Sequence, residues 1–432
     1  MLLSQRLIGT SLGGSTYWAF FIGRASFDYG SDVAVDSSGN AYVVGYNTLE
    51  GAGNHDIFVV KCNNQGVVQW QRALGGGGAD EGFRIGLDSS NNVYIAGFTA
   101  SQGAGGNDIV IAKWNTSGTL QWQKRIGATT DDQGLALTVS SSGTCTLAGK
   151  LGDNGCIIQV NSSGTMLSQH SILHATGIVS FNAVAVDGVG DIYAAGSLTL
   201  NSVANMYLVK LNSSGTILWQ FRSNYNGNAF DDILEGVFAQ SGYLWISGRI
   251  ANDDFSGADQ DFYIAKVNPS NGSIDWQIQT GTLTDNEEGF SITADSNGNS
   301  YVAGTNYLAA YPEVTIAKYN PSGTNQWVRT FTAPYSGYGR GITVDNSGNF
   351  YVAAQITLSL NNSQMALLKF PTSGGRTGTR NGYTYASSSM SSYSSSMSTV
   401  DPSCYRLYPQ LTLNSATLTQ TTTAATSTKV NF

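Results

Sequence analysis

The sequence predicts an all-β protein, a seven-bladed β-propeller with four-stranded blades, its ring closed by an N-terminal strand and followed by an extended C-terminal arm. Three observations predict this fold. Two short phrases alternate along the chain, and each occurs seven times with a period of about 50 residues. The uncharged polar residues and 52 glycines suit hairpin turns rather than helices. One copy of the first phrase stands at the N-terminus, without the rest of its unit.

The first phrase contains a strand, a tight turn with Ser-Gly, and a second strand that carries a tryptophan. Two copies are "IAKWNTSGTLQW" (111–122) and "IAKYNPSGTNQW" (316–327). Six copies end in Gly-x-x-x-Trp, at Trp18, Trp70, Trp122, Trp219, Trp276 and Trp327. A seventh copy, 157–168, ends in Ser168 instead. One tryptophan per unit on an outer strand favours packing between neighbouring blades over a carbohydrate-binding platform.

The second phrase forms the other hairpin of each unit, as in "VAVDSSGNAYVVG" (33–45). Its anchor positions are Asp36, Asp88, Ser140, Asp187, Gln240, Asp295 and Asp345. Ser-Gly and Asn-Gly turns supply the positive φ angles that short hairpins require. Two hairpins make four strands per unit, and four strands at this period are typical of a propeller blade.

The last unit lacks a tryptophan strand, because none follows "MALLKFPTSGG" (365–375). The unpaired tryptophan strand lies at the N-terminus, in residues 15–23. We expect it to pair beside the third strand of the last blade, which leaves neither strand with an open edge. The predicted organisation is therefore an N-terminal extension (1–14), the propeller (15–374) and a Ser/Thr-rich C-terminal arm (375–432).

The arm begins where the composition changes, and "ASSSMSSYSSSMST" (386–399) is of low complexity. Such a segment buries too little apolar surface to order by itself, which favours a disordered tail. Its tyrosines and leucines favour the alternative, an arm that orders by adding strands to another subunit. Both interpretations stay open at this point.

The repeated unit resembles a known repeat. The phrases "DSSGNAYVVGYN" and "DIFVVKCNNQGVVQW" are similar to the SBBP-type β-propeller repeat of bacteria and viruses, and the resemblance covers about residues 15–370. Blade three departs from it at Gln159 and Ser168, and blade five at "FAQSGYLW" (238–245). The resemblance extends to propeller proteins of marine bacteriophage tails and virions, in which Ser/Thr-rich tails follow the propeller.

Composition excludes several classes of function. The net charge of −8 and the absence of a basic stripe argue against binding nucleic acid. No apolar run is long enough to span a membrane, and the N-terminal residues lack the pattern of a signal peptide. The cysteines and histidines have no metal-ligand spacing, so we expect no zinc site and no cofactor.

The long loops on one face of the ring are the predicted place for binding. Acidic residues recur in them, namely Asp28, Asp56, Asp80, Glu81, Asp108, Asp131, Asp132, Asp231, Asp232, Asp285, Glu287 and Glu288. They form either an acidic rosette that binds a cation or a basic partner, or turns that lead into each inner strand. Turn formation alone favours Asp at such positions, so the structural interpretation is preferred, and the metal question stays open.

The residue types in the sequence argue against the enzyme classes that use a propeller fold. Only Arg84 and Arg340 are arginines of the predicted inner strands, whereas sialidases need three around the channel. We therefore expect a non-enzymatic structural or binding propeller. The resemblance implies a component of a bacteriophage virion, assembled from the host cytoplasm, as a tail, baseplate, fibre or surface-decorating subunit. Its partners would be other virion or assembly proteins, reached through the arm, and a host-surface ligand. The alternatives are a carboxylate-dependent propeller hydrolase or lyase and a bacterial cell-surface adhesin.

Overall fold

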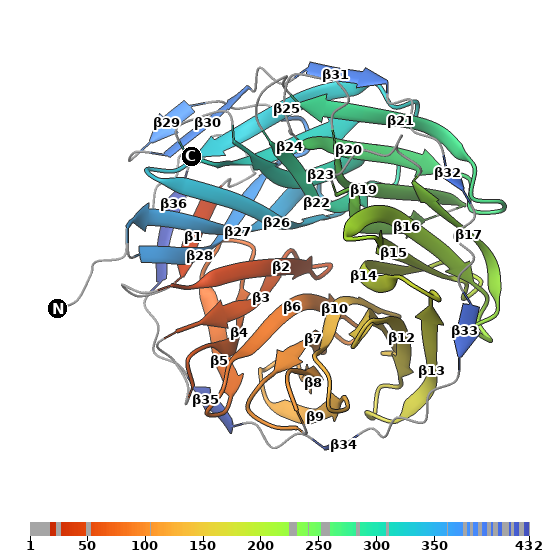
Figure 1. Cartoon of the computed structure of the whole chain (residues 1–432). Coiled ribbons are helices and arrows are strands. Elements are labelled where there is room, and N and C mark those ends of the chain that lie inside the picture. The colour runs from red at the N-terminus through yellow and green to blue at the C-terminus, as the bar shows by residue number, and fades with distance from the viewer. Residues whose placement is uncertain are drawn as a thin grey trace.

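The computed structural model describes residues 18–22, 27–48, 53–103, 105–223, 231–240, 242–251, 260–281, 286–307, 311–360 and 362–374, and beyond them the backbone of eight short strands. The described chain forms seven antiparallel sheets arranged as blades around a central axis (Figure 1). The predicted seven-bladed propeller with four-stranded blades is confirmed. The predicted extension 1–14 lies outside the described residues.

The first three blades follow one another along the chain. Blade one contains β2 (Tyr29–Val35), β3 (Ala41–Asn47), β4 (Asp56–Cys62) and β5 (Val68–Gly75). Blade two contains β6 (Asp80–Leu87), β7 (Val93–Thr99), β8 (Asp108–Trp114) and β9 (Leu120–Ile126). Blade three contains β10 (Asp132–Val139), β11 (Cys145–Leu151), β12 (Asn154–Val160) and β13 (Met166–Leu173).

The next three blades repeat this order. Blade four contains β14 (Ile178–Val186), β15 (Ile192–Leu200), β16 (Val203–Leu211) and β17 (Ile217–Ser223). Blade five contains β18 (Ile233–Gln240), β19 (Tyr243–Ala251), β20 (Gln260–Val267) and β21 (Ile274–Gly281). Blade six contains β22 (Glu287–Ala294), β23 (Ser300–Asn306), β24 (Glu313–Tyr319) and β25 (Asn325–Thr332).

Blade seven joins the two ends of the propeller. Its first three strands, counted from the axis outward, are β26 (Ser336–Val344), β27 (Asn349–Ser359) and β28 (Asn362–Pro371), and its fourth, outer strand is β1 (Trp18–Ile22). The strand β1 is antiparallel to β28, with Trp18 opposite Lys369 and Ile22 opposite Met365. The predicted closure by the N-terminal strand beside the third strand of the last blade is confirmed.

The hydrophobic core is divided among the seven interfaces between blades. Each of seven clusters of buried apolar side chains draws on two adjacent blades. At the closing interface, Trp18 and Phe20 pack with residues of blade one, whereas Ala19 and Phe21 pack with residues of blade six. Because both faces of β1 are buried, this strand is apolar throughout.

The tight turns of the hairpins are built by Asp and Asn side chains. In blade one, Asp36 Oδ1 accepts hydrogen bonds of 2.9 Å from the backbone N–H groups of Ser38 and Asn40. Between β8 and β9, Asn115 Oδ1 accepts from the N–H of Thr119 at 2.9 Å, and Gly118 adopts a φ of 77°. These are the Asx turns and left-handed glycines that the repeated phrases predict.

The repeated tryptophans lie between blades, as predicted. The Trp70 ring of blade one lies against Gly118 of blade two, where an added Cβ would be 2.7 Å from the ring. Its Nε1–H donates to Thr116 O at 3.0 Å. Trp18, Trp122, Trp219 and Trp276 donate in the same way to the following blade, and Trp327 lies against Gly374.

Blade three replaces the missing tryptophan with a residue that the repeat pattern did not indicate. Ser168 stands at the tryptophan position, and two residues later the buried His170 lies against Gly215 of blade four. An added Cβ at Gly215 would be 2.3 Å from His170 Nε2. The imidazole therefore fills the interface that an indole fills elsewhere.

The arm runs around the outside of the ring (Figure 1). Its strands are β29 (Gly378–Arg380), β30 (Tyr383–Ser387), β31 (Ser391–Ser394), β32 (Thr399–Val400), β33 (Tyr405–Leu407), β34 (Asn414–Ser415), β35 (Thr419–Thr422) and β36 (Ser427–Asn431). From β30 to β36, each strand pairs antiparallel with the outer strand of one blade, from blade six back to blade one and then blade seven. The strand addition expected on another subunit thus occurs within the chain, because the unpaired outer edges of its own blades are nearer.

Candidate functional site

The inner strand of every blade carries a β-bulge at the same place. The register of each inner strand shifts around one residue, and these residues are Ser31, Phe83, Leu135, Asn182, Glu235, Phe290 and Arg340. A bulge inserts an unpaired residue and changes the direction of its side chain. All seven of these residues line the central cavity.

The residue before the bulge explains why glycine recurs in these strands. It is Gly30, Gly82, Gly134, Gly289 or Gly339 in five blades. An added Cβ at Gly82 would be 2.5 Å from a methyl of Val44 in blade one. Close approach of neighbouring inner strands therefore requires glycine there, while the following residue is free to vary.

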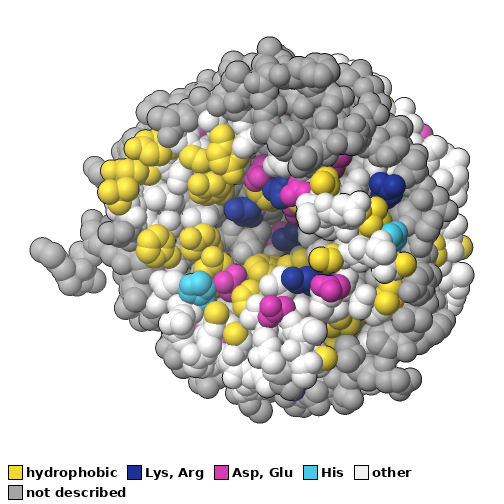
Figure 2. All heavy atoms as spheres, in the orientation of Figure 1, with side chains coloured by type: hydrophobic (Ala, Val, Ile, Leu, Met, Phe, Trp, Pro, Cys, Tyr) yellow, Lys and Arg dark blue, Asp and Glu magenta, His cyan; other side chains and the backbone are white. Residues whose placement is uncertain are grey.

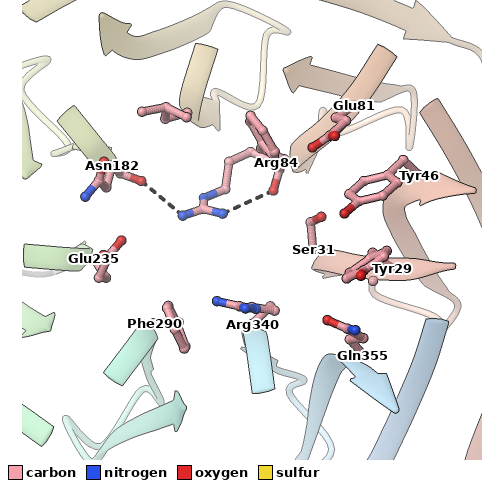
Figure 3. A pocket seen from close by; sticks show the side chains of 13 residues that line it. Tyr29, Ser31, Tyr46, Glu81, Arg84, Asn182, Glu235, Phe290, Arg340 and Gln355 are labelled. Carbon is pink, nitrogen blue, oxygen red and sulfur yellow. Dashed lines mark hydrogen bonds between the residues drawn. The ribbon is translucent and has the colours of Figure 1, made fainter. Parts of the chain in front are cut away.

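The cavity has a volume of about 370 Å³ and lies at the centre of the ring. Figure 2 shows basic and acidic side chains gathered around this hollow. Figure 3 shows the side chains of the bulge residues together with Tyr29, Tyr46, Glu81, Arg84 and Gln355 around one open space. The cavity is thus of a size that accepts a small ligand or one group of a larger partner.

Arg84 has a structural role in this cavity. It extends from β6 across to blade four, where Nη2 donates to Asn182 O at 3.0 Å, and Nη1 donates to Phe83 O at 3.1 Å (Figure 3). Asp32 lies beside it and accepts from the N–H of Ile85 at 3.1 Å. Burial raises the pKa of the Asp32 carboxyl, and the Arg84 charge partly offsets that rise.

Arg340 differs from Arg84 in its contacts. Its guanidinium lies 4.1 Å from the ring centroid of Phe290 and 5.6 Å from that of Tyr338. It makes no hydrogen bond or ion pair with any residue that the structure describes. A guanidinium held on aromatic faces keeps its five N–H donors available for an anion.

Glu235 is the acidic member of the ring of bulge residues. Burial raises the pKa of its carboxyl, which Arg249 and Arg84 partly offset and Glu288 reinforces. Arg249 itself pairs with Glu288 at 2.8 Å. Among the described residues, Glu235 has no hydrogen-bond partner of its own.

A column of stacked rings forms one wall of the cavity. Tyr29 stacks on Tyr46 with ring centroids 4.5 Å apart, and Tyr46 stacks on His55 at 4.8 Å. His55 Nδ1 lies 2.9 Å from Glu81 Oε1. Burial raises the pKa of the Glu81 carboxyl, and the contact with His55 partly offsets this. The wall offers flat apolar surface beside polar groups, a combination typical of ligand pockets.

Some of the predicted acidic loop residues lie in pairs, since an added Cβ at Gly75 would meet carboxylate oxygens of Asp56 and Asp80, and one at Gly127 would meet those of Asp108 and Asp132. Seven are buried, namely Asp28, Asp56, Asp80, Asp108, Asp132, Asp232 and Glu287. Two of these carboxylates serve turns: Asp80 accepts from the N–H of Gly76 at 2.8 Å, and Asp132 from that of Ala128 at 2.7 Å. These two contacts agree with the structural interpretation, and the choice between turn residues and binding residues stays a prediction for the whole set.

The remaining acidic residues have different positions. Asp131 and Asp231 are exposed and accept backbone hydrogen bonds from Asn107 and Ala204. Glu81 lines the cavity and pairs with His55, and Glu288 pairs with Arg249. Asp285 lies outside the described residues. Within the part of the chain that the structure describes, no group of three or more His, Cys, Asp or Glu residues could hold a metal ion.

Three charged residues of the cavity lining, Arg84, Glu235 and Arg340, are not among the binding residues that the sequence predicts. In the sequence, the two arginines count only as too few for a sialidase, and no motif marks Glu235. A signal was present: aligning the seven units shows a position that differs in every unit except for a shared Phe, directly after a repeated glycine in five of them. Positions that pack between blades have similar residues in every repeat. A position whose residue type varies from repeat to repeat, directly after a repeated glycine, therefore indicates a side chain that does not pack between blades.

Comparison with known proteins supports the repeat. Residues 21–46 match the family model described as SBBP, a beta-propeller repeat. This confirms the resemblance to that repeat over residues 21–46, while the resemblance to phage tail proteins stays a prediction. An uncharacterized WD repeat-containing protein of Acanthamoeba polyphaga mimivirus is 23% identical over 385 residues, 79% of this chain and 25% of that protein. The chain therefore spans about a quarter of the length of this relative.

The solved structures that match this chain are distant from it in sequence. The beta-propeller domain of the Trilobed protease from Pyrococcus furiosus has a TM-score of 0.46 and 10% identity, covering 80% of this chain and 95% of that one. Sqt1 from Chaetomium thermophilum has a TM-score of 0.46 and 10% identity, covering 83% and 99%. No helix in the described part of the chain has the length and apolar character needed to cross a bilayer.

Proposed function

We propose that this chain is a non-enzymatic binding propeller that holds an anionic group of its ligand in the central cavity. The observation that carries the proposal is Arg340, a guanidinium stacked on Phe290 and Tyr338 that makes no hydrogen bond or ion pair with the described residues. Arg84, by contrast, is held by backbone carbonyls. A carboxylate or sulfate accepts two parallel hydrogen bonds from a guanidinium, and a protein site is strongest where the cation is positioned in advance.

The test compares two arginines of similar chemistry. Arg340→Met keeps the aliphatic chain over Phe290 and removes the charge. Arg329→Met is the matched control, because the Arg329 guanidinium also lies on an aromatic ring, 5.7 Å from that of Trp327, on the outer strand β25. Binding of acetate, glucuronate and sulfate to the full chain is measured by calorimetry.

We expect at least one anion to bind the wild type, and Arg340→Met to weaken that binding roughly tenfold, as for a charge-assisted hydrogen bond. Arg329→Met leaves the affinity unchanged. Glucose, as a neutral partner of glucuronate, binds more weakly. Binding of none of the three anions, or equal loss in both variants, contradicts the proposal.

A narrower proposal concerns the biological setting. We infer a virion component from the resemblance to phage propellers, the low charged fraction of 12% and the Ser/Thr-rich arm. The cavity would then receive an acidic group of a host-surface ligand, and assembly proteins would dock on the outer face that the arm covers. A cell-surface adhesin would present the same cavity from a bacterial surface.

A second candidate function is a carboxylate-dependent hydrolase, and Glu235 is the observation that favours it. A carboxyl whose pKa is raised by burial is suited to general acid catalysis, and Glu81 supplies a further carboxyl at the same cavity. Glu235→Gln separates the two functions, because it abolishes product formation by a hydrolase and leaves a binding protein able to bind its anion.

A further inference from the structure

Blade five departs from the hairpin that supports the other blades. In five blades a Tyr hydroxyl donates to the Asp six residues earlier, at 2.9–3.2 Å, in the pairs Tyr42–Asp36, Tyr94–Asp88, Tyr193–Asp187, Tyr301–Asp295 and Tyr351–Asp345. Blade five has Gln240 and Trp245 at these positions, with one residue fewer between them. In this hairpin the indole N–H of Trp245 does not donate to the side chain of Gln240 as the Tyr hydroxyls donate to Asp elsewhere.

Two buried polar atoms are left over as a result. Trp245 is 2% exposed, and its Nε1–H has no hydrogen-bond partner among the described residues. The Oε1 atom of Gln240 is also buried without a partner among them. Phe238 and Gln240 on β18 lie opposite Trp245 and Tyr243 on β19, so all four side chains share one face of the hairpin. The indole N–H donor of Trp245 and the amide oxygen acceptor of Gln240 therefore both lack partners on the same face of the hairpin.

A pocket of about 330 Å³ opens beside these atoms, between the turns of blades five and six. Gln240, Tyr243, Trp245, Lys266, Asn297 and Pro321 line it. Water takes about 30 Å³ per molecule in the liquid, so the space is much larger than one bridging water needs. Tyr243 is 45% exposed, and its ring centroid lies 5.5 Å from that of Trp245. The pocket thus has an aromatic wall and two unsatisfied polar atoms.

The charged groups around the pocket already have partners within the fold. Lys266 Nζ lies 4.2 Å from the Tyr243 ring centroid and 3.8 Å from Asp275 Oδ2. Asp295 accepts hydrogen bonds from Asn297, Asn299 and Tyr301. A ligand here needs no net charge, and it must donate and accept hydrogen bonds beside a flat apolar surface.

We propose that this pocket binds one neutral pyranose residue of a glycan. A sugar hydroxyl donates and accepts at the same time, so adjacent hydroxyls satisfy both Trp245 Nε1–H and Gln240 Oε1. The C–H face of a pyranose packs on an aromatic ring such as Tyr243. The site is separate from the central cavity, since it lies at the tight turns and shares no residue with the cavity lining.

The test follows the indole N–H signals of the full chain by NMR during titration with the methyl glycosides of glucose, galactose and mannose. The signal that disappears in Trp245→Phe assigns Trp245. Gln240→Met keeps the side-chain length and removes the acceptor. Trp70→Phe is the control, because Trp70 lies in blade one and its Nε1–H already donates to Thr116 O.

We expect at least one glycoside to shift the Trp245 signal, and Gln240→Met to weaken that binding roughly fivefold, as for one neutral hydrogen bond. Trp70→Phe leaves the affinity unchanged. If no glycoside moves the Trp245 signal, or if Gln240→Met binds as tightly as the wild type, water alone occupies the pocket and the proposal is overturned. Anion binding by Arg340 is measured separately, so failure here leaves the proposed function standing.

Discussion

Single residues give this repetitive ring its chemical asymmetry. The seven bulge residues occupy equivalent positions, yet they include an acid, a base, an amide, a hydroxyl and three apolar side chains. Glu235 is the acidic member; burial raises the pKa of its carboxyl, and it has no hydrogen-bond partner among the described residues. At the residue scale, the chemistry of the cavity comes from the bulge positions, where packing does not restrict the residue type.

Glu235→Gln is expected to stabilise the propeller at neutral pH. Burial raises the folded-state pKa of Glu235 above its ordinary value of 4.5. Between those two values the folded state binds a proton that the unfolded state does not, so wild-type stability falls as pH rises through the folded pKa. Urea unfolding at pH 4 and pH 7 should show the variant's advantage at pH 7 only. Asp153→Asn, an exposed carboxylate, is the control and should behave alike at both pH values.

At the scale of elements, the hairpin with an Asx turn is the unit that repeats. Asp88 accepts from the N–H groups of Ser90 and Asn92, the amide of Asn92 and the hydroxyl of Tyr94. Burial alone would raise its pKa, but these hydrogen bonds outweigh burial and lower it. The charged carboxylate therefore stabilises the hairpin, and this stabilisation is lost as the pH falls through its lowered pKa.

Asp88→Ala is expected to destabilise the protein by about 1–3 kcal/mol, because the Tyr94 hydroxyl and turn N–H groups lose their acceptor. Asp88→Ser should cost less, since blade three naturally has Ser140, whose Oγ accepts from the N–H of Thr144 at 2.9 Å. Urea unfolding at pH 7 measures both. Equal losses in the two variants would show that the charge, and not the turn acceptor, is what matters.

At the scale of the whole molecule, segments from the two ends of the chain have different roles in the ring. The strand β1 contributes side chains to the cores on both sides of blade seven. The arm strands instead pair with the outer edges of blades whose four strands are already formed. Loss of β1 would leave blade seven without its outer strand and open the ring. Loss of the arm would leave the ring closed and expose the outer strand of each blade.

We therefore expect deletion of residues 375–432 to leave a cooperative, folded propeller that no longer assembles with its partners, and deletion of residues 1–22 to abolish cooperative folding. Thermal unfolding and native mass measurement, alone and after purification from the source, check both. A truncated chain that still enters a large particle would refute docking at the outer face that the arm covers. A chain without residues 1–22 that unfolds like the wild type would refute the closing role of β1.

The sequence by itself determined the number of blades, the four strands in each, the closing strand, the Asx turns and the tryptophans between blades. These features depend on contacts within one unit or between consecutive units, and seven copies make such local signals readable. Only the tertiary structure decided which side chains meet on the axis, where Arg340 and Glu235 come from blades far apart in the chain. It also decided that His170 replaces a tryptophan, that most acidic loop residues are buried, and that the arm pairs with its own blades. The meeting of side chains on the axis and the path of the arm depend on contacts between units far apart in the chain, and His170 interrupts the repeated pattern, so none of these outcomes is encoded in the repeat.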